Sequence, residues 1–412
     1  MLTKYKLGEL VDVTRGMSLP GENYSEEGEL IRLTLGNFDY AGGGFKENTS
    51  KKDIYYVGEV KDEYILKEGD IITPLTEQTV GLLGSTAMIP ESGKYIQSQD
   101  VALVTCKTDK IDHLFCYYLI SSDVVRKQLS AAAQQTKIRH TSPDKIMDCV
   151  VWVPELSLQK KIGKALYTIE KKISLNTRLN AELEAMAKQL YDYWFVQFDF
   201  PDENGKPYKS SGGKMVYNEK LKRDIPEGWE DDVLSNIANI TMGQSPDGSS
   251  YNGTGEGTIF YQGSTDFGIR FPSVRMYTTA PSRYAKKGDI LMSVRAPVGD
   301  TNIANNDCCI GRGLSAMNSK IGSTSHLYYI IRDLKAKFDR LNAAGTTFGA
   351  INKDELFNLP VVRPNKKVLQ KYEALCAPIF NKQMNIGYEI EQLTHLRDSL
   401  LPMLMNGQVT VE

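Results

Sequence analysis

The sequence contains the same pattern twice, and this internal repeat constrains the fold more than any other feature. A basic residue, Gly-Asp-Ile and a later Val-Gly occur in "KEGDIITPLTEQTVG" from Lys67 and again in "KKGDILMSVRAPVGD" from Lys286. Further matches keep their order along the chain, while the offset between the copies falls from 227 residues near the start to about 210 near the end. Ordered matches with gradually changing spacing indicate a tandem duplication with loop insertions and deletions. The sequence therefore predicts two copies of a unit of about 210 residues.

The length and composition agree with a multidomain globular protein. A chain of 412 residues is too long for one hydrophobic core, and 41% apolar with 24% charged residues is an ordinary globular composition. No apolar run reaches the length of a membrane span, and the start lacks the apolar core of a signal peptide, so we expect a cytoplasmic protein. The six cysteines form no C-x-x-C pair, which favours reduced thiols. A net charge of −2 gives no global attraction to nucleic acid, so DNA binding would need local patches.

Each copy combines a strand-rich part with a helical part. The first part, about 150 residues, carries short alternating runs such as "VALVTC" between turn signals, which predicts a mixed domain of short strands. In the second part apolar residues recur every seven positions, which predicts a coiled coil whose seam faces a partner helix. An amphipathic helix packed on its own domain stays open as the alternative, but two matched helices in one chain favour pairing with each other. The seam residues are Ile162, Ile169, Asn176, Leu183 and Leu190 in the first copy and Ile379, Ile386, Leu393 and Leu400 in the second.

The repeat also predicts an α+β fold with defined domain boundaries. The first strand-rich domain covers 1–153 and the first helix 154–197. A polar segment with several turn signals, 198–230, connects the copies. The second strand-rich domain covers 231–363, and the second helix with a tail covers 364–412.

An aromatic run, "YDYWF", lies at the end of the first predicted helix. One interpretation is a plug of the local core. The other is a docking surface for another subunit, because Tyr and Trp are favoured interface anchors. The candidate docking residues are Tyr191, Tyr193, Trp194 and Phe195.

The sequence contains no recognisable catalytic constellation. None of the four histidines has metal-ligand spacing with a cysteine or a second histidine, so no metal is expected. His113 and His326 occupy matched positions before Leu, which favours a structural role in each copy. There is no G-x-S-x-G nucleophile motif, no phosphate-binding loop and no Asn/Asp-Pro-Pro-aromatic tetrapeptide of an amino-group DNA methyltransferase. The chain is therefore predicted to bind rather than to catalyse.

The signal for DNA binding is local. The stretch from Arg126 to Lys145 carries five Lys or Arg against one Asp, and Gln, Thr and Arg can read base edges while Lys and Arg neutralise phosphates. The matching stretch of the second copy aligns in frame but differs in its polar residues, as expected for two related modules that read different sequences. The candidates in the first copy are Arg15, Ser18, Thr76, Gln78, Gln134, Gln135, Thr136, Lys137 and Arg139. Those in the second copy are Gln244, Ser245, Arg270, Arg275, Arg295, Arg312, Thr346, Thr347 and Phe348.

With these motifs the chain resembles the specificity subunit of type I restriction-modification systems over essentially its whole length. The resemblance rests on the two-copy layout, on "GDIIT" and "GDILMSVRAPVG", and on the helix entries "VPELSLQKKI" and "RPNKKVLQKY". It also rests on the central segment "YDYWFVQFDFP" with "IPEGW" further on. The helix entries lack the Pro-Pro and Glu-Gln that are common in the family, which affects only the details of the helix start.

The resemblance implies two target-recognition domains in a pseudo-two-fold tandem repeat, each reading one half of a split DNA site. It implies that the helices pair as an antiparallel coiled coil that sets the gap between the half-sites. Two methyltransferase (modification) subunits that bind S-adenosylmethionine would dock on this chain, and restriction subunits that use ATP and magnesium would join them. No cofactor is expected in this chain itself. The alternatives are a specificity subunit of a type II-like system, in which one partner both methylates and cleaves, or a duplicated scaffold that does not bind DNA.

Overall fold

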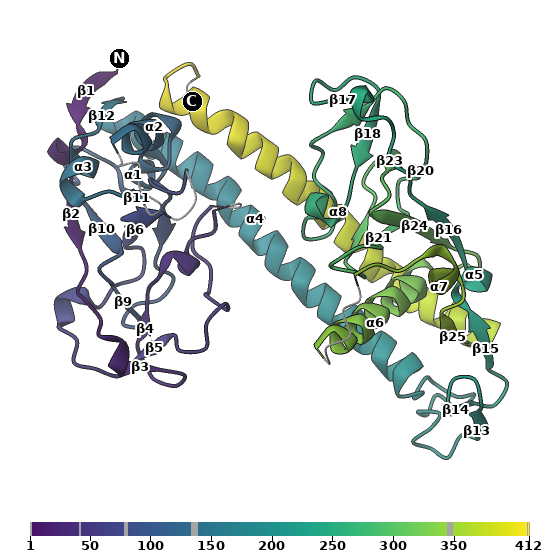
Figure 1. Ribbon diagram of the computed structural model, residues 1–412. Coiled ribbons are helices and arrows are strands. Elements are labelled where there is room, and N and C mark those ends of the chain that lie inside the picture. The colour runs from purple at the N-terminus through teal and green to yellow at the C-terminus, as the bar shows by residue number, and fades with distance from the viewer. Residues whose placement is uncertain are drawn as a thin grey trace. The chain divides into compact units, whose positions relative to one another are not determined.

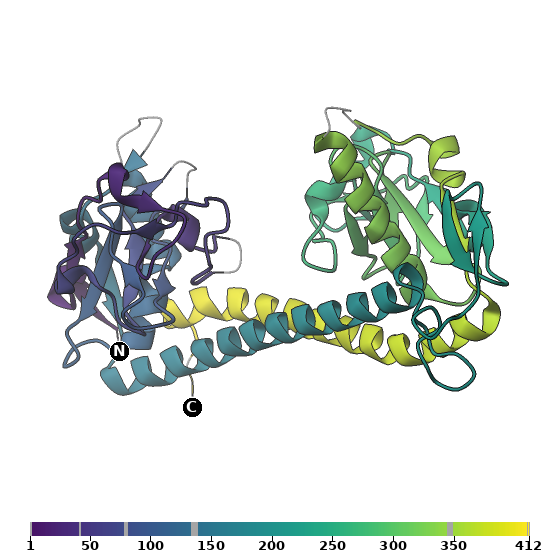
Figure 2. The same ribbon diagram turned by 90° about the horizontal axis from the view of Figure 1, so that it is seen from below.

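The computed structural model describes residues 2–40, 43–77, 81–132, 139–343, 349–409 and 411 (Figure 1). The chain forms two compact units. Unit 1 comprises Met1–Ser174 with Glu391–Glu412, and unit 2 comprises Leu175–Ile390. The long helices α4 (Leu156–Tyr191) and α8 (Lys366–Met405) each contribute one part to each unit. In each unit the strand-rich part lies on one side of these helical parts (Figure 2).

Unit 1 is an α+β unit built on short strands. Its helices besides α4 and α8 are α1 (His113–Ile120), α2 (Asp123–Ala132) and α3 (Pro143–Met147). Its strands are β1 (Thr3–Lys6), β2 (Val11–Arg15), β3 (Tyr24–Ser25), β4 (Ile31–Arg32), β5 (Tyr55–Tyr56), β6 (Ile71–Pro74), β7 (Thr76–Glu77), β8 (Ala87–Met88), β9 (Tyr95–Ile96), β10 (Val101–Cys106), β11 (Arg139–His140) and β12 (Val150–Val153).

The strands of unit 1 form two four-stranded sheets and two strand pairs. One sheet is antiparallel in the order β2-β10-β6-β8, and the other has the order β3-β5-β4-β9. The pairs are β1-β12 and β7-β11. Apolar residues of α1, α2 and the first sheet make one core with the start of α4 and the end of α8. The predicted strand "VALVTC" is β10, which has a partner strand on each side.

Unit 2 repeats this plan with variations. Its helices are α5 (Leu234–Ile237), α6 (Thr324–Ala343) and α7 (Lys353–Phe357). Its strands are β13 (Met215–Asn218), β14 (Arg223–Pro226), β15 (Glu230–Val233), β16 (Ala238–Met242), β17 (Tyr251–Asn252), β18 (Thr258–Tyr261), β19 (Tyr277–Thr278), β20 (Tyr284–Ala285), β21 (Ile290–Ser293), β22 (Thr301–Ile303), β23 (Cys308–Ile310), β24 (Leu314–Ser319) and β25 (Pro360–Arg363).

The sheets of unit 2 correspond to those of unit 1. The order β16-β24-β21-β22 matches β2-β10-β6-β8, and the pair β15-β25 matches β1-β12. A five-stranded sheet, β17-β19-β18-β23-β20, takes the place of β3-β5-β4-β9. One helix, α6, stands where unit 1 has α1 and α2. The predicted α+β fold with two strand-rich domains in tandem is confirmed.

The two Gly-Asp-Ile runs form matching turns. Gly69 and Gly288 have φ values of +86° and +92°, in the left-handed region that favours glycine. In each turn the Asp carboxylate accepts the backbone N–H of the residue three positions earlier, at 2.8 Å. Each turn leads directly into a buried strand, β6 or β21. The repeated motif is therefore framework.

The two long helices pair antiparallel. In unit 2, Asn176 of α4 donates to Glu389 of α8 at 2.8 Å, and Gln383 of α8 donates to Glu184 of α4 at 2.9 Å. Residues further along α4 contact residues earlier in α8, as expected for antiparallel helices. In unit 1 the two helices share a core through Ile162 of α4 and residues of its partner helix. The predicted coiled-coil pairing is confirmed.

The seam follows the predicted heptads, although not all of its residues are fully buried. Ile162, Asn176 and Ile386 are buried. The remaining seam residues are half-buried: Ile169, Leu183, Leu190, Ile379, Leu393 and Leu400. Asn176 is a buried polar seam residue with a partner on the facing helix, as expected of a residue that specifies helix register.

The connecting segment after α4 is more structured than its polar composition predicts. Phe198, Phe200 and Trp229 are buried in the core of unit 2, and a hairpin of β13 and β14 lies between them in sequence. Phe200 stacks on Trp229, with ring centroids 5.0 Å apart. This segment is therefore part of unit 2. The predicted boundaries at 198 and 230 stay a prediction.

Candidate nucleic-acid interface

Exposed polar residues follow the edge strand of the main sheet in each unit. In unit 1, Arg15 ends β2 and Ser18 follows it, and both side chains are exposed. The matching turn of unit 2 carries Gln244, which is exposed, and Ser245, which is half-buried and accepts the backbone N–H of Arg312 at 3.3 Å. The exposed side chains of Arg15, Ser18 and Gln244 are therefore available to a ligand, whereas the Ser245 hydroxyl is used within the turn.

A glycine in each of these turns explains why the backbone follows the same path. A Cβ on Gly16 would lie 2.2 Å from the carbonyl oxygen of Gln97, and a Cβ on Gly243 would lie 2.2 Å from that of Gly311. No side chain fits at such a distance. Both turns therefore require glycine for close backbone packing.

Two further predicted cations are exposed in unit 2. Arg295 follows β21 and forms an isolated bridge with Ala350, and its side chain is exposed. Arg312 is exposed in the turn between β23 and β24. Together with Gln244 they are candidates to contact a polyanion from the ends of neighbouring strands.

Several predicted residues lie outside the described part of the chain. In the first copy these are Gln78, Gln134, Gln135, Thr136 and Lys137, and in the second Thr346, Thr347 and Phe348. Their role stays a prediction.

The structure corrects the interpretation of Arg139 as a base-reading residue. Its side chain is only 16% exposed, and its guanidinium forms an ion pair with Glu77 at 3.1 Å. It also donates to the backbone carbonyl of Ser130. Thr76, in the strand next to Glu77, is buried as well. Both were expected at a DNA surface, but their environment holds them inside unit 1.

Arg270 is a second correction, for the same physical reason. It is buried in unit 2, where its guanidinium pairs with Glu184 of α4 at 3.3 Å and lies over the Phe380 ring at 4.7 Å. Glu184 also accepts from Arg332 of α6. A guanidinium buried against a carboxylate links the strand-rich part to the helices and is not offered to a ligand.

Arg275 differs from these two. Its side chain is 57% exposed but pairs with Asp266, to whose carboxylate its Nε donates at 3.0 Å. An exposed cation with a neighbouring carboxylate remains accessible, with part of its charge compensated.

The aromatic run at the end of α4 is largely core. Tyr191, Trp194 and Phe195 are buried, and Phe195 packs edge-on against Tyr372 of α8 at 4.8 Å. Of the four residues predicted to dock a partner, only Tyr193 is partly exposed, at 37%. The first of the two interpretations, a plug of the local core, therefore holds for three of the four.

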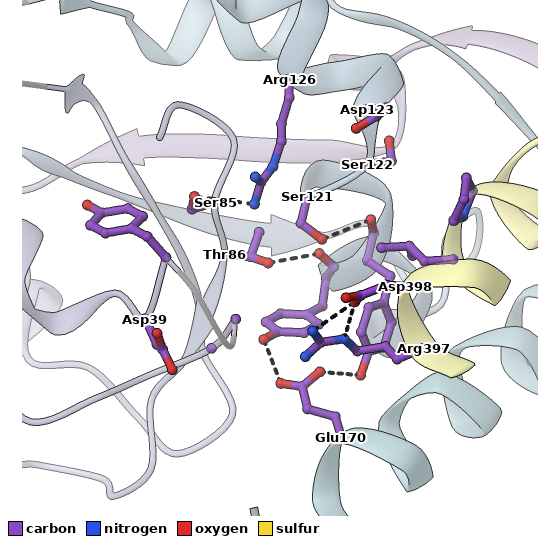
Figure 3. A pocket seen from close by; sticks show the side chains of 17 residues that line it. Asp39, Ser85, Thr86, Ser121, Ser122, Asp123, Arg126, Glu170, Arg397 and Asp398 are labelled. Atoms are coloured by element: carbon purple, nitrogen blue, oxygen red, sulfur yellow. Dashed lines mark hydrogen bonds and ion pairs between the residues drawn. The ribbon is translucent and has the colours of Figure 1, made fainter. Parts of the chain in front are cut away.

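A polar pocket of about 360 Å³ lies in unit 1 between the strand-rich part and the helices (Figure 3). On its floor Glu170 of α4 accepts the hydroxyls of Tyr117 at 2.9 Å and Tyr118 at 2.6 Å. Burial, and then the charge of Glu170, raises the pKa of both tyrosines. Arg126 of α2 points into the pocket toward Ser85, 3.3 Å away. The tyrosine contacts join α1 to α4, and Arg126 joins α2 to the chain before β8.

The matched histidines have different environments. In unit 1, Nε2 of His113 lies 2.9 Å from the carbonyl oxygen of Gly69, so it contacts the Gly-Asp-Ile turn. A hydrogen bond with the Cys106 thiol raises the pKa of His113. His326 is buried among aromatic rings, with Phe195 at 4.4 Å, and burial lowers its pKa to about 3. Both histidines have structural roles, but His113 contacts a turn, whereas His326 packs in an aromatic core.

Sequence reasoning missed three buried or half-buried carboxylates that organise these contacts. Glu77, Glu170 and Glu184 lie in polar or heptad contexts that are typical of solvated residues. Their arginine or tyrosine partners are far away in sequence, so no local pattern marks these pairs. Among the described residues no group of three or more His, Cys, Asp or Glu side chains could hold a metal ion. Within the same residues, no helix combines the length and apolar character of a membrane span.

Two similar strand-rich domains, each joined to a long helix, define a duplicated two-domain protein, and comparison with known proteins specifies its class. The family model for the type I restriction modification DNA specificity domain matches residues 2–185 and again 226–374. A putative type I restriction enzyme MjaX specificity subunit from Methanocaldococcus jannaschii is 30% identical over 391 residues, covering 88% of this chain and 85% of that protein. The type I restriction enzyme HindI specificity subunit from Haemophilus influenzae is 22% identical, covering 65% of this chain and 70% of that protein.

A solved structure shows the same fold. The S subunit of a type I restriction-modification system from M. genitalium superposes with a TM-score of 0.62 at 15% identity, covering 98% of this chain and 96% of that chain. The chain belongs to the type I restriction-modification DNA specificity family, as a specificity subunit with two tandem specificity domains.

Proposed function

We infer that this chain is the sequence-reading subunit of a DNA-modifying complex and carries no catalysis of its own. Each strand-rich domain reads one half of a bipartite DNA site, and α4 and α8 set the gap between the halves. The observation that carries this proposal is the double match of the specificity domain, combined with exposed polar residues at corresponding turns, such as Ser18 and Gln244. The shared framework accounts for one mode of binding, and the divergent turns account for two different sequences.

The partners follow from the family. Double-stranded DNA, two adenine methyltransferase subunits and restriction subunits would assemble with this chain. S-adenosylmethionine, ATP and magnesium would belong to those partners, and no residue of this chain is assigned to them. A type II-like system with one partner for methylation and cleavage remains the second candidate, and the genes that neighbour this one would separate the two.

Mapping methylated adenines in host DNA, with and without this chain, tests the proposal. The expected result is one bipartite motif that disappears when the chain is removed. Exchanging residues 1–153 for those of a relative should change one half of the motif only. A scaffold that does not bind DNA would leave the methylation pattern unchanged.

Residues of the predicted recognition stretch provide a finer test. Lys137→Ala should weaken binding to all duplexes and reduce its salt dependence, because a phosphate contact carries no sequence information. Gln135→Ala should relax the choice of base at one position by about 1–3 kcal/mol. Filter-binding titrations at several salt concentrations measure both effects. Equal losses on all sequences for both variants would contradict the base-reading role of Gln135.

A further inference from the structure

The buried carboxylate of Glu77 holds together two segments of unit 1 that are distant in sequence. Its Oε2 accepts the backbone N–H groups of Gly81, Leu82 and Leu83 at 3.0, 2.7 and 3.0 Å. Its Oε1 forms the 3.1 Å ion pair with Arg139. The side chain of Glu77 is 1% exposed, so solvent contributes little to its stabilisation.

Arg139 extends this link to α2. Its guanidinium donates to the backbone carbonyl of Ser130, in the last turn of α2, and also lies 3.4 Å from the hydroxyl of that residue. The pair therefore connects the chain after β7 with both flanks of the stretch between α2 and β11. These two segments contain most of the residues predicted to contact DNA in the first domain, Gln78 and Gln134 to Lys137.

Unit 2 has no such charge pair at the matching place. The register is clear, because Thr141 donates to Leu75 in unit 1 and Ile351 donates to Val294 in unit 2, both at 2.9 Å. In this alignment of the two copies, Ala296 is the equivalent of Glu77, and Gly349 is the equivalent of Arg139.

At those positions the chain of unit 2 is held by its backbone and by one hydroxyl. The Ala296 N–H donates to the Gly349 carbonyl at 3.0 Å. The Ser293 hydroxyl accepts the N–H of Asp300 at 2.9 Å. The charge pair is thus particular to the first domain.

We propose that Glu77 and Arg139 are a pair of positioning residues that sets the sequence selectivity of the first target-recognition domain. The pair does not touch bases. It holds β7, β11 and the last turn of α2 in one arrangement, and the residues predicted to read bases neighbour these elements in the sequence. A buried pair suits this role because removing one partner leaves an uncompensated charge, which the surrounding chain must move to solvate. This inference rests on the proposed function.

The experiment uses the full-length chain assembled with its methyltransferase subunits. The substrates are duplexes with the wild-type motif, taken from the methylation map, or with single-base substitutions in either half. The quantity measured is the ratio of methylation rates between the intact and the substituted motif, for each half separately. A loss of stability alone lowers the methylation rates of the intact and the substituted motif equally, so their ratio stays the same. A loss of positioning changes this ratio.

Glu77→Gln should lower this ratio about tenfold in the first half-site and leave the second unchanged. Glutamine keeps a carbonyl oxygen for the three backbone N–H groups but loses the ion pair. Arg139→Met should have the same effect, and the double variant should be no worse than either single, because the two residues act as a unit. Arg139→Lys retains the charge and should restore part of the ratio. Lys6→Met, which removes an exposed pair with Asp148, is the matched control and should change neither half.

The outcomes separate the two levels of the argument. If the wild-type complex methylates no bipartite motif, the proposed function fails, and this inference fails with it. If the motif is present but Glu77→Gln changes both ratios equally or neither, this inference alone is overturned. Should Glu77→Gln fail to fold, as thermal unfolding would show, the contrast between Arg139→Lys and Arg139→Met decides. Equal ratios for those two variants contradict the proposal.

Discussion

Units 1 and 2 share the strand order of their main four-stranded sheet, but they stabilise the junction with the helices differently. Where the long helices end, unit 2 buries Trp194 and Phe195, whereas unit 1 buries Leu404 and Met405 at the matching positions of α8. From α4, unit 2 pairs Glu184 with Arg270 and Arg332, and unit 1 pairs Glu170 with the hydroxyls of Tyr117 and Tyr118.

The difference shows which parts of the duplicated unit are constrained. Positions that require a backbone conformation, such as Gly69 and Gly288, are the same in both copies. Positions that only fill space or pair charge have diverged, because cores tolerate changed side chains when volume and polarity are kept. The copies thus share a scaffold while their junctions and turns differ.

The largest effect is expected at the helix ends. Trp194→Ala should destabilise unit 2 by about 3–5 kcal/mol, because it removes a large buried ring that packs on Tyr372 at 5.7 Å. Leu404→Ala should destabilise unit 1 by about 2–5 kcal/mol. Hydrogen exchange followed by mass spectrometry reports the two units separately. Tyr193→Ala, at a partly exposed neighbouring residue, is the control. If Trp194→Ala accelerated hydrogen exchange equally in both units, the effect would not be due to local packing in unit 2.

The close-packed glycines should come next. Gly16→Ala and Gly243→Ala each force a Cβ to 2.2 Å from a carbonyl oxygen, so each should cost about 1–3 kcal/mol or more in its own unit. Gly21→Ala, whose Cβ would meet nothing closer than 3.8 Å, is the control in unit 1. Denaturation midpoints measure the cost. If one of the two substitutions proved neutral, the copies would not share this turn.

The matched histidines predict opposite responses to acid. The pKa of His326 falls from 6.5 in the unfolded chain to about 3 in the folded unit, so the unfolded chain binds the proton first. The stability of unit 2 should therefore fall between pH 6.5 and 3, by at most about 1.4 kcal/mol per pH unit. The pKa of His113 is raised in the folded unit, so its protonated form stabilises unit 1. This stabilisation is present at low pH and is lost as the pH rises through the folded-state pKa. His326→Phe should flatten the pH profile of unit 2 in denaturant titrations, and an unchanged slope would contradict this assignment.

The smallest effect is expected at the repeated turns. Gly69→Ala and Gly288→Ala should each cost about 1–2 kcal/mol, because alanine disfavours positive φ although nothing lies within 4 Å of the added methyl group. Asn tolerates this conformation better, so Gly69→Asn and Gly288→Asn should cost less. Thermal unfolding measures all four variants. If the loss of stability differed between Gly69→Ala and Gly288→Ala, the two turns would not be energetically equivalent despite their similar backbone geometry.

Much of the fold could be predicted because its signals are local. The duplication, the strand-rich domains and the heptads of α4 and α8 all depend on residues close together in the sequence, and each was confirmed. The environments of Arg139 and Arg270 could not be predicted in this way. Their partners Glu77 and Glu184 lie 62 and 86 residues away, and nothing near any of the four in the sequence marks it as part of an ion pair.

The sequence by itself determined that this protein is a tandem repeat of a strand-rich domain with a long helix, because periodicity and turn residues are properties of short stretches. Only the tertiary structure decided which cations are available to DNA and which are internal. Arg15, Arg295 and Arg312 are exposed, whereas Arg139 is held by buried Glu77 and Arg270 by half-buried Glu184. The physical reason is that the burial of a charge depends on a partner brought close by folding, and the fold brings together residues that the sequence keeps apart.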